Sequence, residues 1–199
     1  MEKPSGKTAL IVVDMQYDFI DGSLAVPGAE RVVDEARDII NAHDYDYVIF
    51  TQDSHPRGHI SFASRWDKEG QPVQPFDTLN GNVVWPDHCV IGTRGHAIHD
   101  DLHPYLSDAS LVVPKGTNVD RDAYTGFDSG TLETWLRELG VDRVKIIGLA
   151  FDYCVRATAL DAAALGFRTE VIKRATASVF PADDDRVQQE LAAHGVEVV

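Results

Sequence analysis

Short apolar, β-branched runs alternate with helix-like patterns along the chain, and this alternation limits the possible folds most strongly. Apolar residues recur at helical spacing in residues 32–40, 132–139, 154–165 and 183–193. Strands that are apolar on both faces and are joined through helices form parallel sheets. We therefore expect an α/β fold with an open, mostly parallel six-stranded sheet and helices on both faces, as in Rossmann-like proteins. The expected strands cover residues 9–13, 47–51, 111–114, 144–149, 169–173 and 196–199.

The segment from about residue 55 to residue 110 does not follow this alternation. It is rich in proline and glycine, but it also contains Phe62, Trp66, Phe76 and Trp85, which argue against disorder. Loops of this length inside a compact domain usually have a function. We expect a packed loop excursion over the active face of a single domain that spans residues 1–199.

The charge balance argues against nucleic acid as a partner. The 199 residues include 18 Lys and Arg against 32 Asp and Glu, a formal net charge of -14, and no basic cluster is visible. The apolar run that follows Lys7 ends at Asp14, which is too short for a membrane span or for a signal-peptide core. The two cysteines do not indicate a disulfide framework. These features favour a reduced, cytoplasmic protein without a membrane partner.

Four chemically versatile residues lie at or just after the carboxyl ends of four different predicted strands: Asp14, Asp53, Lys115 and Cys154. Ligands of open α/β sheets bind outside these strand ends, so we expect the four side chains to share one crevice. Neither a glycine-rich dinucleotide fingerprint nor a phosphate-binding loop is present. The combination suits nucleophilic chemistry, in which a cysteine attacks, a carboxylate takes its proton and a cation holds the charge.

Cys154 follows the strand predicted over residues 144–149 and stands at the start of a predicted helix. We expect Asp152 to cap this helix, which places Cys154 in the first turn, where free N–H groups and the helix dipole lower a thiol pKa. The alternative is that Cys154 is a small buried apolar residue, the commoner fate of a free cysteine. For Lys115, the alternative is an ordinary exposed charge.

Asp53 and His55 form a possible metal half-site. Residues two apart in an extended chain point the same way, so the carboxylate and the imidazole would face one ion. One hard oxygen and one nitrogen suit Zn, Mn or Fe, and His88 in the excursion could complete the site. The alternative is that Asp53 caps a turn and that His55 is solvated.

Seven short segments carry a resemblance to a known family. They are VVDMQYDF at 12–19, QDSHP at 52–56, HISFA at 59–63, WPDHC at 85–89, KG at 115–116, YTGF at 124–127 and GLAFDYCVRATA at 148–159. On these segments the chain resembles, over nearly its whole length, the nicotinamidases of the isochorismatase-like cysteine hydrolase superfamily.

The resemblance implies a set of site residues. Cys154 would be the nucleophile, Asp14 its general base and Lys115 the cation that orients the pair. The backbone N–H groups of Ala150 and Cys154 would form the oxyanion hole, and a cis peptide bond would precede Ala150. One divalent metal ion, usually zinc but in some members iron or manganese, would be held by three residues, and some members add a ligand near the position of His59. The three are Asp53, His55 and His88.

The reaction implied by the resemblance is the hydrolysis of nicotinamide to nicotinate and ammonia through a thioester, a step of NAD salvage. Phe19, Trp85 and Tyr124 would surround the pyridine ring, and the ring nitrogen would face the metal. A homo-oligomer is also possible. Two alternatives are a related hydrolase of a carbamoyl or maleamate-type amide, and a non-catalytic binding or redox-sensing member. Phe151 departs from the family pattern, in which a small polar residue is common, and its ring could either narrow the crevice or pack away from it.

Overall fold

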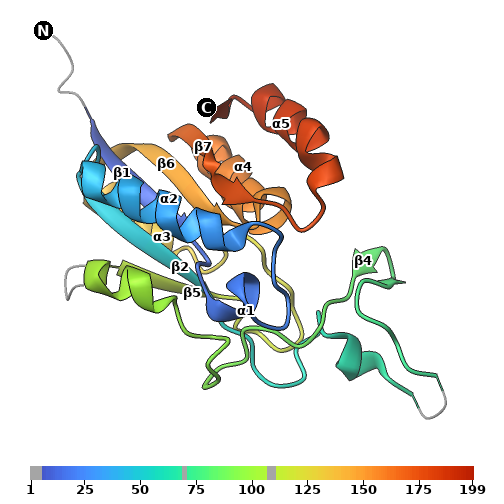
Figure 1. The fold of residues 1–199 in the computed structure, drawn as a ribbon. Helices are drawn as coiled ribbons and strands as arrows, with labels where there is room; N and C mark the ends of the chain where they lie inside the picture. The colour runs from blue at the N-terminus through green and yellow to red at the C-terminus, as the bar shows by residue number, and fades with distance from the viewer. Residues whose placement is uncertain (1–5, 69–70, 107–110) are drawn as a thin grey trace, which may run out of the picture.

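The computed structural model describes residues 6–68, 71–106 and 111–199. Its centre is a six-stranded sheet with the strand order β5-β2-β1-β6-β7-β8, and every neighbouring pair is parallel (Figure 1). The predicted fold class is therefore confirmed. The strands are β1 (Lys7–Val13), β2 (Tyr47–Asp53), β5 (Leu111–Lys115), β6 (Val141–Leu149), β7 (Arg168–Ala177) and β8 (Glu197–Val198).

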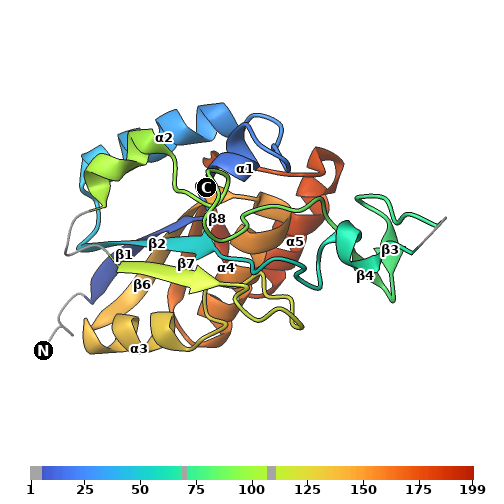
Figure 2. The same cartoon turned by 90° about the horizontal axis from the view of Figure 1, so that it is seen from below.

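Helices cover both faces of the sheet (Figures 1 and 2). The α-helices are α1 (Tyr17–Ile20), α2 (Ala29–Ala42), α3 (Thr131–Glu138), α4 (Arg156–Ala164) and α5 (Asp184–Ala193). Alternate residues of β1 point to opposite faces, so Leu10 and Val12 pack in the core with α2, whereas Ile11 packs with α3, α4 and α5. Within the described ranges, no helix is long and apolar enough to cross a membrane.

The strand order places a switch point next to β1. From β1 the chain builds outward to β2 and β5, then returns to the other side of β1 with β6 and continues to β7 and β8. The connections on the two sides of β1 therefore diverge at the carboxyl ends of β1 and β6, which leaves a crevice there. Asp14 follows β1 and Cys154 follows β6, so the topology brings both to this crevice.

The excursion between β2 and β5 contains short elements that the sequence did not predict. These are the 3-10 helices η1 (Ala63–Trp66) and η2 (Asp100–Tyr105) and the hairpin of β3 (Thr78–Leu79) and β4 (Asn82–Val83). Phe62 and Trp85 are buried, as expected of a packed excursion, but Phe76 is 49% exposed. The hairpin projects from one end of the molecule, away from the central sheet (Figure 2).

Two helices begin differently from the sequence-based prediction. The sequence predicts Asp128 or Ser129 as the cap of α3, but the N-cap residue is Gly130, whose φ of 73° is accessible to glycine at little cost, while Ser129 Oγ accepts a hydrogen bond from Thr131 N at 3.3 Å. A turn of π-helix, η3 (Phe151–Val155), precedes α4, and the Asp152 side chain does not cap it. The carboxylate of Asp152 instead accepts hydrogen bonds from the backbone after β7.

Candidate active site

The turn that carries Cys154 begins at the end of β6. The Leu149–Ala150 peptide bond is cis, as the family resemblance implied. The carbonyl of Ala150 accepts hydrogen bonds from Tyr153 N at 3.1 Å and from Val155 N at 3.0 Å, which closes the η3 turn around Cys154. Because a Cβ at Gly148 would lie 2.1 Å from Val13 O, only glycine permits this close approach of β6 to β1.

Lys115 connects the three other residues of the predicted crevice. Its Nζ lies 2.9 Å from Asp14 Oδ2, 3.0 Å from Asp53 Oδ1 and 3.3 Å from Cys154 Sγ. All four side chains are buried, and Lys115 is 2% exposed, so the alternative of an exposed lysine does not hold. The structure thus brings together the carboxylate, the cation and the thiol that the sequence placed at separate strand ends.

The two carboxylate oxygens of Asp14 have different surroundings. Thr51 Oγ1 donates to Asp14 Oδ1 at 2.7 Å, while Oδ2 makes the ion pair with Lys115 but has no hydrogen-bond partner among the described residues. Burial raises the pKa of Asp14, and the attraction of Lys115 only partly opposes this rise. Asp14 also has a φ of 47°, an unusual backbone conformation for a residue other than glycine.

The electrostatics of the thiol differ from the sequence-based expectation. Burial raises the pKa of Cys154 well above its usual value of 9.0, although the nearby Lys115 acts in the opposite direction. The resting thiol is therefore protonated and needs a base. Burial would lower the pKa of Lys115, but Asp14 and Asp53 outweigh this effect and hold it well above 10.5, so the lysine is a cation at neutral pH.

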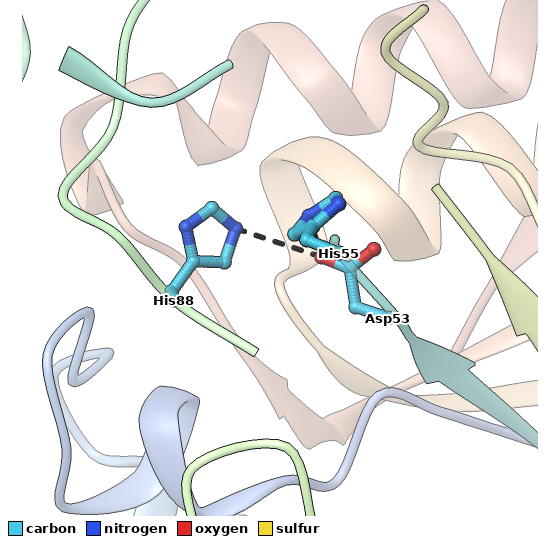
Figure 3. Close-up of side chains that lie close together, drawn as sticks. All are labelled: Asp53, His55 and His88. Carbon is cyan, nitrogen blue, oxygen red and sulfur yellow. Dashed lines mark ion pairs between the residues drawn. The ribbon is translucent and has the colours of Figure 1, made fainter. Parts of the chain in front are cut away.

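Asp53, His55 and His88 form a compact group that could hold a divalent metal ion (Figure 3). Their ligand atoms all lie within 4.8 Å of one another. Asp53 Oδ2 is 2.9 Å from His55 Nε2 and 3.6 Å from His88 Nε2, whereas Oδ1 of the same carboxylate faces Lys115. Asp53 therefore joins this group to the group of Asp14, Lys115 and Cys154. The attractions of Lys115 and His55 outweigh burial, so the pKa of Asp53 is well below 3.8.

Hydrogen bonds orient both imidazoles toward this point. His55 Nδ1 lies 3.0 Å from Gly116 O, and His88 Nδ1 lies 2.8 Å from Pro86 O. Nε2 of each ring therefore faces Asp53, and in the tautomer in which Nδ1–H donates to the carbonyl, the lone pair of Nε2 would be available to a metal ion. One carboxylate oxygen and two imidazole nitrogens fit Zn, Fe or Mn and leave positions open for other ligands.

A cavity connects the two groups, since Cys154, Asp53 and His88 all line it. The predicted ring-binding residues Phe19, Trp85 and Tyr124 also line the cavity, and Trp85 Nε1 donates to Tyr124 Oη at 3.1 Å. Three further lining residues were missed by sequence reasoning because no pattern singles them out: Leu24, Tyr153 and Val179.

Comparison with known proteins decides the family. The sequence model of the protein family described as the isochorismatase domain matches residues 8–199 of this chain. The chain belongs to the isochorismatase family. A nicotinamidase from Saccharomyces cerevisiae is 35% identical over 215 residues, which cover 96% of this chain and 98% of the relative.

Solved structures of the isochorismatase family agree with this assignment. The yeast nicotinamidase bound to the inhibitor nicotinaldehyde superposes with a TM-score of 0.88 at 33% identity, covering 96% of this chain and 99% of that one. The pyrazinamidase of Pyrococcus horikoshii in complex with zinc superposes with a TM-score of 0.82 at 36% identity, covering 97% and 98%. The resemblance to nicotinamidases is thereby confirmed.

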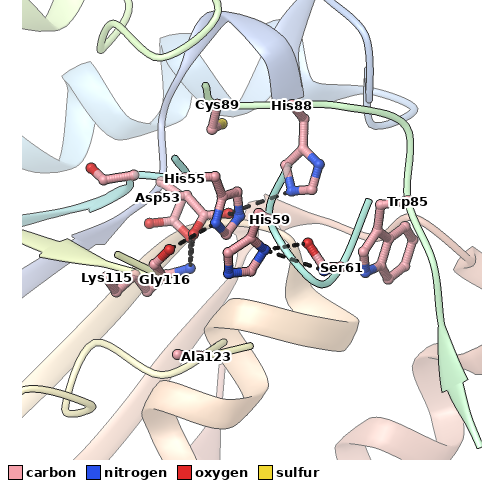
Figure 4. A network of polar contacts seen from close by, with 12 residues as sticks. Asp53, His55, His59, Ser61, Trp85, His88, Cys89, Lys115, Gly116 and Ala123 are labelled. Carbon is pink, nitrogen blue, oxygen red and sulfur yellow. Dashed lines mark hydrogen bonds and ion pairs between the residues drawn. The ribbon is translucent and has the colours of Figure 1, made fainter. Parts of the chain in front are cut away.

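The structure shows the surroundings of Phe151 and His59, two residues of this isochorismatase-family chain whose roles the sequence left open. Phe151 is fully buried and packs in the core on the α4 side of the sheet, with Lys173 Nζ 4.0 Å from its ring centroid, so it does not narrow the cavity. His59 stacks on His55 at 4.0 Å but lies outside the metal group (Figure 4). Its Nδ1 is 2.7 Å from Ser61 Oγ and its Nε2 is 3.3 Å from Arg121 O.

Gln16 is a supporting residue that sequence reasoning missed. Its side-chain Nε2 donates to Asp53 O at 2.8 Å and to His96 O at 2.8 Å, and its Oε1 accepts from Asp53 N at 2.7 Å. The buried amide thus fixes the backbone of Asp53. No local pattern reveals this role, because the partners lie 37 and 80 residues away in the chain.

Proposed function

We propose that this protein is a metal-containing cysteine amidohydrolase that converts nicotinamide to nicotinate and ammonia in NAD salvage. The observation that carries the proposal is that one aromatic cavity is lined both by Cys154 and by Asp53 and His88. The relatives named nicotinamidase and the structure with bound nicotinaldehyde support this choice of substrate.

The first step forms a tetrahedral intermediate. Asp14 Oδ2, which has no hydrogen-bond partner among the described residues, accepts the thiol proton of Cys154. The sulfur then attacks the carboxamide carbon, and the electron pair of the C=O bond moves onto oxygen. Lys115, with Nζ 3.3 Å from Sγ, stabilises the developing thiolate. The backbone N–H groups of Ala150 and Cys154 donate to the oxyanion.

The next steps release the products. The C=O bond re-forms, the C–N bond breaks, and the leaving nitrogen takes the proton from Asp14, so that ammonia departs and a thioester remains. A water molecule attacks the thioester while Asp14 takes one of its protons. The C–S bond breaks, the proton returns to Cys154, and the product acid leaves as nicotinate after it loses its carboxyl proton to solvent. Asp14 therefore acts first as base and then as acid in each half of the reaction.

Substrate orientation depends on the aromatic walls and the metal group. Phe19, Trp85 and Tyr124 enclose a flat ring in the cavity. A divalent cation held by Asp53, His55 and His88, for which zinc is our choice, would supply a Lewis acid for the pyridine nitrogen and so fix which ring edge faces Cys154.

A substrate panel with ammonia as the readout tests this function. The panel contains nicotinamide, benzamide, which lacks the ring nitrogen, and a carbamoyl amide. We expect nicotinamide to be the best substrate. Benzamide should have a kcat/KM at least about tenfold lower, because it has no ring nitrogen to bind the metal. Preference for the carbamoyl amide would instead assign the chain to another amidase of this family.

A further inference from the structure

Asp152 is a buried carboxylate to which the proposed mechanism gives no role. It lies in η3, two residues before Cys154, and is 4% exposed. Its Oδ1 accepts from Val179 N at 3.0 Å and its Oδ2 accepts from Phe180 N at 2.8 Å. Each oxygen therefore holds one N–H group of a segment 27 to 28 residues further along the chain. Such charge-assisted pairs are stronger than neutral hydrogen bonds.

The segment that Asp152 holds forms one wall of the reaction cavity. Val179 lines this cavity together with Ala150 and Cys154. The ring of Phe180 contacts Tyr153, another lining residue, at 6.3 Å between centroids. Strand β7 ends at Ala177, so residues 178–180 have no sheet partner to fix them. Their position relative to the nucleophile depends on side chains.

Two carboxylates hold this segment from different elements. Asp184 Oδ1, in α5, accepts from Ser178 Oγ at 2.5 Å, and its Oδ2 accepts from Lys173 Nζ at 2.7 Å. Asp184 thus ties the segment to a helix on the outside of the sheet. Asp152 ties it to the turn of the nucleophile.

We propose that Asp152 is a positioning residue for substrate binding, because it sets the distance between the Val179 wall and Cys154. The choice of substrate in this inference rests on the proposed function. The new part is that Asp152 fixes the width of the ring-binding cavity. The η3 turn has its own hydrogen bonds to Ala150 O, so the loss of Asp152 displaces the wall more than the nucleophile.

The test compares Asp152→Asn with the matched control Asp184→Asn. Asparagine keeps the shape of the side chain but turns an NH₂ group toward one of the two N–H donors. For Asp152→Asn we expect KM for nicotinamide to rise roughly tenfold with kcat changed less than about threefold. The preference for nicotinamide over an analogue with a methyl group on the pyridine ring, measured as the ratio of their kcat/KM values, should also fall. For Asp184→Asn we expect a lower Tm but an unchanged KM and an unchanged preference.

Further variants test whether the rise of KM in Asp152→Asn arises at the Val179 wall. Combined with Val179→Ala, Asp152→Asn should add little to the change in KM, since both act on the same wall. If Asp152→Asn does not fold, Asp152→Glu serves instead: it keeps both acceptor oxygens but shifts the wall by a methylene group, so KM should also rise. A wild-type KM in Asp152→Glu, or equal changes of KM in Asp152→Asn and Asp184→Asn, would overturn the proposal.

A second readout does not depend on the amidase reaction. The rates at which iodoacetamide and N-phenyliodoacetamide alkylate Cys154 are measured by mass spectrometry. We expect the ratio of the two rates to change in Asp152→Asn and to remain at the wild-type value in Asp184→Asn. If the wild-type protein released no ammonia from nicotinamide while this ratio changed as expected, the proposed substrate would fail and the role of Asp152 would stand. An unchanged ratio in Asp152→Asn would overturn that role.

Discussion

At the scale of single residues, the buried charge of Lys115 is the feature on which the site depends most. Its ammonium group is buried between Asp14 and Asp53 and also contacts the thiol of Cys154. A buried charge is tolerated only when partners compensate it, and here each partner also needs the lysine. Asp14 and Cys154 on one side and the metal group on the other therefore depend on the same lysine.

Replacement of Lys115 by methionine should destabilise the metal-free protein by about 3–5 kcal/mol at pH 7, since it leaves two buried carboxylates without a cation. Lys145→Met, which removes the ion pair with the largely exposed Asp44, should cost less than about 1 kcal/mol. Denaturant unfolding in the presence of a chelator measures both values. Equal costs for the two variants would contradict the account.

The same variant has a defined pH dependence. The folded-state pKa of Asp53 is below 3.8, so its ionised form contributes stability above that pH, which is lost as the pH falls through the folded value. The folded-state pKa of Lys115 is above 10.5, so its contribution is present below that pH and is lost as the pH rises through the folded value. The stability gap between wild type and Lys115→Met should therefore be largest near neutral pH and narrow toward pH ~4, where the variant can protonate its carboxylates.

At the residue scale, we expect metal binding to depend on His88 and not on His59. We expect added Zn²⁺ to raise the Tm of chelator-treated wild type and of His59→Ala, because both ring nitrogens of His59 face other partners. His88→Ala should lose this rise, since it removes one of three ligands. Metal analysis of the dialysed proteins provides the stoichiometry. A full Tm rise in His88→Ala, or its loss in His59→Ala, would show that the ligand set is wrong.

At the scale of elements, the turns that leave the strands determine the site. Gly116 follows β5 with a φ of 64°, and a Cβ there would lie 2.5 Å from His55 Cε1 and 3.0 Å from Asp53 Oδ1. Gly130 has a similar φ of 73°, but nothing lies within 4 Å of its Cβ position. The two glycines therefore separate the cost of backbone strain from the cost of a clash.

Gly116→Ala should weaken Zn²⁺ binding at least about tenfold, because it displaces His55 and the carbonyl that orients its ring. Gly130→Ala should cost only about 1 kcal/mol of stability from its positive φ and should leave Zn²⁺ affinity unchanged. Competition titration with a chromogenic chelator measures the affinities. Equal affinities in the two variants would mean that the turn after β5 does not position the metal group.

The elements also show where sequence reasoning stops. The strands that lead to Asp14, Asp53 and Lys115 could be predicted to within two residues of their ends, because buried parallel strands are continuous apolar runs. The role of Asp152 could not, since an aspartate before a helix is normally a cap and its actual partners, Val179 N and Phe180 N, are remote in the chain. The raised pKa of Cys154 was missed for a related reason: helix position is local, whereas burial depends on the whole fold.

At the scale of the whole molecule, the parallel sheet assembles the site from remote segments. The Asp14 and Cys154 side chains meet because β1 and β6 are neighbours at the switch point of the sheet. The alternation of strands and helices made this arrangement predictable. The β3–β4 hairpin could not be predicted, because two-residue strands have no periodicity. The hydrogen bonds from the Gln16 side chain to the Asp53 backbone could not be predicted either, because they depend on which strands are neighbours.

The measurement that tests the central claim most directly is ammonia release from nicotinamide by wild type, Cys154→Ala and Cys89→Ala. Cys89 is buried like Cys154 but does not line the reaction cavity, so it is the matched control. We predict rapid release by wild type and by Cys89→Ala, and a loss of at least about a thousandfold in kcat for Cys154→Ala, because among the described residues no other cysteine lines the cavity and could form the thioester. Ammonia release by Cys154→Ala at the wild-type rate would contradict the account.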